Sequence, residues 1–72
     1  MSDSLNRTAA DLAAVAEELD RAASHARTAA GHFRDGVVPR GCAHIVSVEG
    51  HLLNARSVLD RVAIAHAAHS TP

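Results

Sequence analysis

A single cluster of helix-breaking residues divides the chain. Gly36, Pro39 and Gly41 fall close together, and no comparable cluster occurs elsewhere in the 72 residues. On both sides of it, apolar residues recur at helical spacing. The sequence therefore predicts an all-α protein, a two-helix antiparallel hairpin with helices over about 4–35 and 41–68. We expect one domain over 1–72, with a turn over 36–41 and a frayed tail over 67–72.

The N-terminal stretch has an unbroken heptad repeat, whose positions are written a to g. Position a holds Leu5, Leu12, Leu19, Ala26 and Phe33, and position d holds Thr8, Val15, Ala22 and Ala29. Such a pattern predicts that positions a and d form the seam with the second helix. Position e is always alanine: Ala9, Ala16, Ala23 and Ala30. These small side chains either let another helix approach closely or are present because alanine is the best helix former.

The C-terminal stretch is more apolar than one partner helix can cover. Its predicted seam consists of Ile45, Val48, Leu52, Ala55, Leu59 and Val62, followed by His66 and His69. Further apolar residues flank that seam, among them Val46, Leu53, Val58 and Ile64. Because an exposed patch of this size is a liability in a monomer, we predict a homodimeric, antiparallel four-helix bundle. Val46, Leu53, Val58 and Ile64, with the position e alanines, are the predicted interface.

Size and composition narrow the functional classes. A chain of 7.5 kDa buries a small core and usually needs a disulfide, a metal or a partner subunit. Cys42 is the only cysteine, which excludes an internal disulfide and favours a reducing cytoplasm. No apolar run reaches the roughly 20 residues of a membrane span, and the first residues lack signal-peptide features. We therefore expect a cytoplasmic protein that does not enter the membrane.

Charge and aromatic content argue against nucleic-acid binding. The formal net charge is -1, and the arginines are scattered along the chain. Phe33 is the sole aromatic residue, so no stacking platform for bases is available. We expect no nucleic-acid partner and no anionic-membrane surface.

Four histidines carry the chemically suggestive pattern. His25, His32, His44 and His51 all occupy position g, and in an antiparallel hairpin the two g edges face each other near the turn. Imidazole and thiolate ligands suit zinc, copper or nickel. The candidate ligands are His32, His44, His51 and Cys42, with His25 as a weaker one. The alternatives are ordinary seam residues and a pH-dependent association.

The sequence gives little support for catalysis. Cys42 lies near the start of the second helix and two residues from His44, but no orienting third group is evident. We predict a non-enzymatic interaction or assembly module that acts by self-association or by binding another helical protein. The alternative is a metal-binding or metal-sensing helical bundle that uses the histidine cluster.

Overall fold

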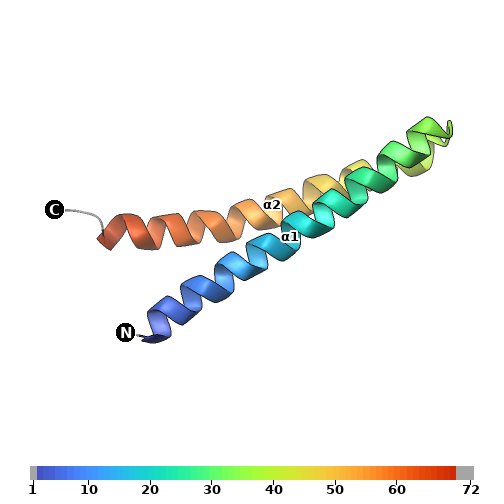
Figure 1. Ribbon diagram of the computed structural model, residues 1–72. Helices are drawn as coiled ribbons and strands as arrows, with labels where there is room; N and C mark the ends of the chain where they lie inside the picture. Colours follow the sequence, from blue (N-terminus) through green and yellow to red (C-terminus); the bar gives the residue numbers. More distant parts are fainter. Residues whose placement is uncertain (1, 70–72) are drawn as a thin grey trace.

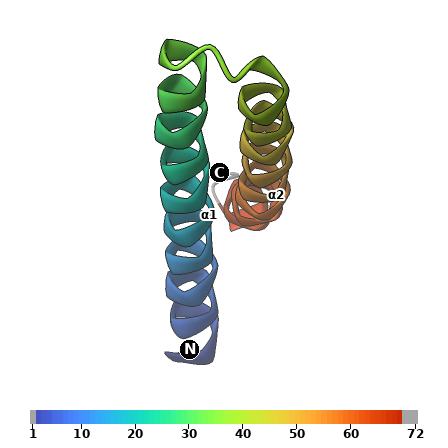
Figure 2. The ribbon, with the colours of Figure 1, turned by 90° about the vertical axis from the view of Figure 1, so that its right-hand side faces the viewer.

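The computed structural model describes residues 2–69 and consists of two α-helices, α1 (Ser2–Arg34) and α2 (Val38–His69). The helices are antiparallel, lie side by side next to the turn and separate towards the termini (Figure 1; Figure 2). The molecule measures 55 × 20 × 13 Å, so it is a single layer of two helices. The predicted all-α helical hairpin is confirmed.

Gly36 ends α1 in the way that its position in the sequence predicts. Its φ of 76° lies in the left-handed region, where a side chain would be strained. The Gly36 N–H donates to the carbonyl of Phe33 at 3.1 Å, and the Val37 N–H donates to the carbonyl of His32 at 2.7 Å. These two bonds form a Schellman motif, which satisfies carbonyls that the end of the helix would otherwise leave unpaired.

The second helix begins at Val38, three residues before the predicted start, so the turn spans 35–37 rather than 36–41. Gly41 N–H donates to the carbonyl of Val37 at 3.1 Å, which places Pro39 inside the first helical turn. Proline is tolerated there because the first N–H groups of a helix have no intrahelical acceptor.

At its other end, α2 continues to His69. Residues 67–69 of the predicted frayed tail are therefore helical. Residues 70–72 of that tail lie outside the described part of the chain.

Gly41 allows the two helices to meet closely beside the turn. A Cβ added at Gly41 would lie 2.6 Å from Cε2 of Phe33 and 2.8 Å from its Cδ2. The phenyl ring of α1 therefore rests on the backbone of the first turn of α2. Only glycine fits at this contact without displacing the ring.

The seam between the helices differs from the predicted one. Its most buried side chains are Ala22, Ala29 and Ala55, each 5% exposed and each at position d. The other half-buried residues occur mainly at positions d and g of both helices. Position d thus lies inside as predicted, but position g takes the place predicted for position a.

Small side chains account for this rotation of the helices. Alanine at position d, together with Gly41, lets the backbones come too close for leucine to fit between them. The large position a side chains are therefore displaced to one side of the seam, where they are between 41% and 68% exposed. Among the described residues, no large side chain is fully buried.

Candidate functional site: an apolar face and a histidine edge

The position a residues of both helices lie on the same side of the hairpin, because an antiparallel pair keeps equivalent positions on one side. We call this surface the apolar face. It consists of Leu5, Leu12, Leu19, Ala26 and Phe33 of α1 with Val38, Ile45, Leu52 and Leu59 of α2.

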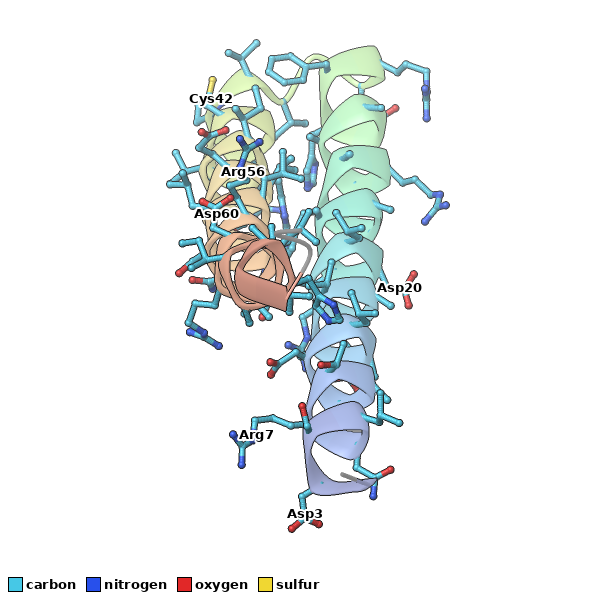
Figure 3. The ribbon with its side chains drawn as sticks, turned by 90° about the vertical axis from the view of Figure 1, so that its left-hand side faces the viewer. Asp3, Arg7, Asp20, Cys42, Arg56 and Asp60 are labelled. Atoms are coloured by element: carbon cyan, nitrogen blue, oxygen red, sulfur yellow. The ribbon has the colours of Figure 1, made fainter. Side chains whose placement is uncertain are left out.

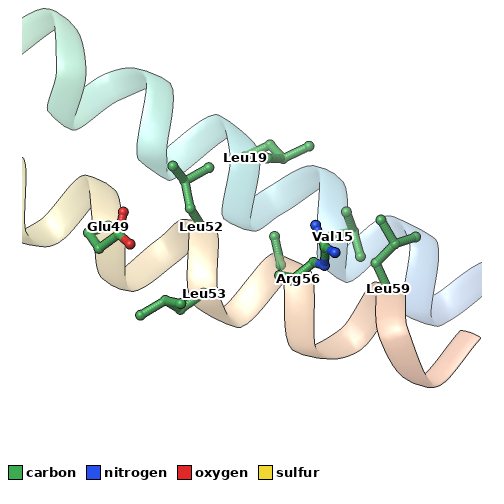
Figure 4. A pocket seen from close by; sticks show the side chains of 8 residues that line it. Val15, Leu19, Glu49, Leu52, Leu53, Arg56 and Leu59 are labelled. Carbon is green, nitrogen blue, oxygen red and sulfur yellow. The ribbon is translucent and has the colours of Figure 1, made fainter.

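A groove runs along the middle of the apolar face and is lined from both helices (Figure 4). In this view Leu52 and Leu59 of α2 extend towards α1, which contributes Val15 and Leu19 to the lining. Leu53 and Ala55 complete the apolar lining. Both helices therefore contribute aliphatic side chains to the groove, and Leu19, Leu52 and Leu59 remain between 42% and 47% exposed.

Two opposite charges flank this groove on the α2 side. Glu49 and Arg56, both at position e, belong to its lining. The Arg56 Nε donates to Asp60 Oδ1 at 3.0 Å, and both of these side chains are exposed. The corresponding flank of α1 is the row of position e alanines, of which Ala9, Ala16 and Ala30 are exposed and Ala23 is half-buried.

The predicted interface residues of α2 separate into two groups. Val46, Leu53 and Ile64 are 72%, 61% and 71% exposed, so they are accessible to a partner. Val58 is half-buried and occupies position g, one heptad after His51. Val58 therefore lies on the seam side of α2, and its place in a second interface stays a prediction.

The exposed area of the hairpin is large for its mass. A folded monomer of 7.5 kDa is expected to expose about 4,200 Å². The hairpin exposes 5348 Å², which is about 1,100 Å² more than that expectation. One partner of a standard protein–protein interface loses about 800 Å². The excess is therefore of the size that an interface removes.

The opposite side of the seam carries the histidine edge, which we define as Glu18, His25 and His32 of α1 with His44 and His51 of α2. The Nδ1 atoms of His25 and His44 lie 2.8 Å apart, and His51 Nδ1 lies 2.7 Å from Glu18 Oε2. The rings of His25 and His51 stack at 5.5 Å between centroids, as do those of His32 and His44. The four predicted histidines thus form one continuous row across both helices.

Proton positions decide how this row holds together. In the contact between His25 and His44, one ring must donate its Nδ1–H and the other must accept it. If both rings were protonated, both nitrogens would be donors and the bond would be lost. The hydrogen bond from His51 holds the pKa of Glu18 below its ordinary value. Desolvation raises this pKa, and the charge of Arg21, whose Nη1 lies 3.3 Å from Glu18 Oε1, lowers it further. Among the described residues, no buried side-chain nitrogen or oxygen lacks a hydrogen-bond partner.

Glu18 was not among the predicted site residues, although a signal for it was present. It occupies position g one heptad before His25, in the same row as the histidines. The heptad register therefore contained the information that Glu18 would face His51.

The predicted metal ligands are not gathered at one point. Cys42 has an exposed thiol and occupies position e, on the flank of the apolar face rather than on the histidine edge. It lies on α2 close to the turn (Figure 3). Within residues 2–69, no group of three or more histidine, cysteine, aspartate or glutamate side chains is placed to hold a metal ion. The arrangement therefore lends no support to a site for zinc, copper or nickel.

Comparison with protein-family models, with curated protein sequences and with solved structures finds no match to this chain. Over the described residues, neither helix combines the length and hydropathy that are needed to cross a bilayer.

Proposed function

We propose that this protein is a non-enzymatic assembly module that works as a homodimer, with the apolar face of each copy as its interface. The observation that carries the proposal is the exposure of the large position a residues, which both helices place on the same side of the hairpin. Four-helix bundles bury surfaces of this kind between their helix pairs.

The energetics of the hairpin favour such a partner. The side chains that it buries most are three alanines, which contribute little apolar area. The large aliphatic side chains remain partly in water on the apolar face. A second layer of helices would move them into a core, and burial of a leucine contributes about 1.5–3 kcal/mol relative to full exposure.

A second copy of the chain suits this surface better than a charged partner does. The apolar face is aliphatic over most of its length, and the two charges that line its groove, Glu49 and Arg56, have opposite signs. A surface with balanced charges is complementary to a second copy of itself, whereas a strongly charged partner would meet no surface of opposite net charge. Another helical protein is the alternative occupant.

The proposed module has no catalytic residues and no cofactor. We also propose a cytoplasmic location, since Cys42 is a free thiol and the chain has no other cysteine with which to form an internal disulfide.

The test compares two charge substitutions on α2 by sedimentation equilibrium. Leu52→Glu places a carboxylate in the groove and is expected to shift the protein from dimer to monomer. Ile64→Glu is the matched control, because Ile64 is 71% exposed and lies at position f, away from the apolar face. A wild-type protein that sediments as a monomer would contradict the proposal, and so would a Leu52→Glu variant that remains as dimeric as Ile64→Glu.

A further inference from the structure

We propose that the second copy packs with its turn at the opposite end of the bundle, so that α1 packs on α1 and α2 packs on α2. In this arrangement Glu49 of each copy faces Arg56 of the other. The inference rests on the proposed dimer and specifies how its two copies are oriented.

The starting point is that Leu19 and Leu52 lie at the same height along the hairpin. They line the same groove from opposite helices. The neighbouring contact between Glu18 and His51, at 2.7 Å, fixes the same register on the other side of the seam. A two-fold axis across the hairpin at this height therefore passes close to both leucines.

On α2, this axis pairs residues of matching character. Ile45 meets Leu59 of the second copy, and Leu52 meets its own equivalent. At position e the axis falls midway between Glu49 and Arg56, which brings each of them opposite the other in the second copy. Two ion pairs then close the flank of the interface.

On α1, the same axis pairs large residues with room to accommodate them. Leu19 meets its own equivalent, Leu12 meets the small Ala26, and Leu5 meets Phe33. The flank is formed by the position e alanines, which have no side chain beyond Cβ. Two α1 helices can therefore approach closely along a flank that carries no charge.

The competing arrangement places both turns at the same end and packs α2 of one copy on α1 of the other. Glu49 and Arg56 would then face the position e alanines of α1, which carry no charge to pair with them. Charge complementarity thus favours turns at opposite ends. The present bond between Arg56 Nε and Asp60 does not prevent the new pair, since the guanidinium has further N–H donors on its two Nη atoms.

Cys42 provides a direct test, because it is the only cysteine and its thiol is exposed. A nitroxide label on Cys42 in the otherwise unchanged full chain reports the distance between the two copies by pulsed electron resonance. With turns at opposite ends, the two Cys42 positions are about 30 Å apart along the bundle axis, from ten residues on each side of the two-fold axis at 1.5 Å each. With turns at the same end, they are about 14 Å apart across the diagonal of a bundle with 10 Å helix spacing.

Charge reversal provides the second readout. Glu49→Arg is expected to weaken the dimer about tenfold, because each of two exposed ion pairs becomes a repulsion. The double variant Glu49→Arg/Arg56→Glu restores opposite charges across the axis and is expected to return the dissociation constant to within about threefold of the wild type.

The outcomes separate this inference from the proposed function. A chain that stays monomeric at all concentrations overturns both. A dimer whose labels lie near 14 Å, or whose affinity the double variant fails to restore, overturns the inference and leaves the dimer standing. A long distance together with restored affinity supports the proposed orientation.

Discussion

The two sides of this hairpin differ in how far the side chains of one helix find contacts with those of the other. On the histidine edge, polar groups from the two helices find each other, as the pairs His25–His44 and Glu18–His51 show. On the apolar face, leucines of both helices meet only at the rim of an open groove. The histidine edge is complete within one chain, whereas the apolar face is not. This difference is the reason why we propose the apolar face, and not the histidine edge, as the side that packs on a partner.

Small residues produce this asymmetry. Three alanines at position d and Gly41 are the most buried residues between the helices, and we attribute the outward position of the leucines to this seam of small residues. The flat imidazole rings stack in the remaining gap on one side, and the aliphatic side chains turn outward on the other. The same close approach of the helices therefore brings the side chains of the histidine edge into contact and leaves those of the apolar face exposed.

The largest effect is expected from shortening the two leucines at the centre of the apolar face. In Leu19→Ala/Leu52→Ala, each substitution should cost about 2–5 kcal/mol, because both leucines are core residues of the proposed dimer. We expect loss of the dimer and loss of cooperative unfolding, measured by sedimentation and by circular dichroism.

The matched control is Val46→Ala/Ile64→Ala, which shortens two exposed aliphatic residues of α2 that do not line the groove. It should change the stability by less than about 0.5 kcal/mol per site. If both double variants lose stability equally, the apolar face is no more important than the rest of the surface.

An intermediate effect is expected at the glycines of α2. Gly41→Ala pushes a methyl group against the Phe33 ring and should destabilise the protein by about 1–3 kcal/mol in denaturant titrations. Gly50→Ala is the control, since a Cβ there meets nothing within 4 Å. Because alanine favours the helix, Gly50→Ala should stabilise the protein by about 0.5–1 kcal/mol. Equal effects at the two sites would show that the close approach at Gly41 does not set the helix spacing.

The smallest effect is expected at the histidine edge and depends on pH. The pKa of Glu18 is lowered in the folded chain, chiefly by the hydrogen bond from His51. The carboxylate therefore contributes stability above the pKa that it has in the unfolded chain, and this contribution is lost as the pH falls through its lowered folded value. In Glu18→Gln, the melting temperature should fall less steeply than in the wild type between about pH 5 and pH 3. Identical slopes for the two proteins would contradict a role for the carboxylate.

Heptad spacing was sufficient to predict the hairpin, because the breakers around Gly36 and the apolar repeats are local signals. It was also sufficient to place the four histidines along one edge. It did not reveal that position g rather than position a would enter the seam. In α1, positions a, d and e are all apolar, so the pattern defines a wide apolar arc and leaves its centre open. The close approach of the two backbones at Gly41 and at the position d alanines decides which part of this arc enters the seam. That approach depends on both helices together, so the pattern of one helix does not reveal it.

The position of Cys42 illustrates the same limit. Its closeness to His44 in the sequence suggested a shared site, but residues two apart on a helix point in different directions. The thiol lies at position e and the imidazole at position g, on different sides of α2. Spacing along the chain was sufficient to predict the two helices. It predicted which residues lie together only where those residues share a heptad position, as the four histidines do at position g.

The central claim is that folding of the hairpin is coupled to covering its apolar face with a second copy. The most direct test is the thermal unfolding of the unmodified wild-type protein, followed by circular dichroism over a hundredfold range of concentration. For a dimer that folds as it associates, the melting temperature rises with protein concentration, because association stabilises the folded state by mass action. A melting temperature that stays constant over that range would show that the hairpin is stable alone and would contradict the claim.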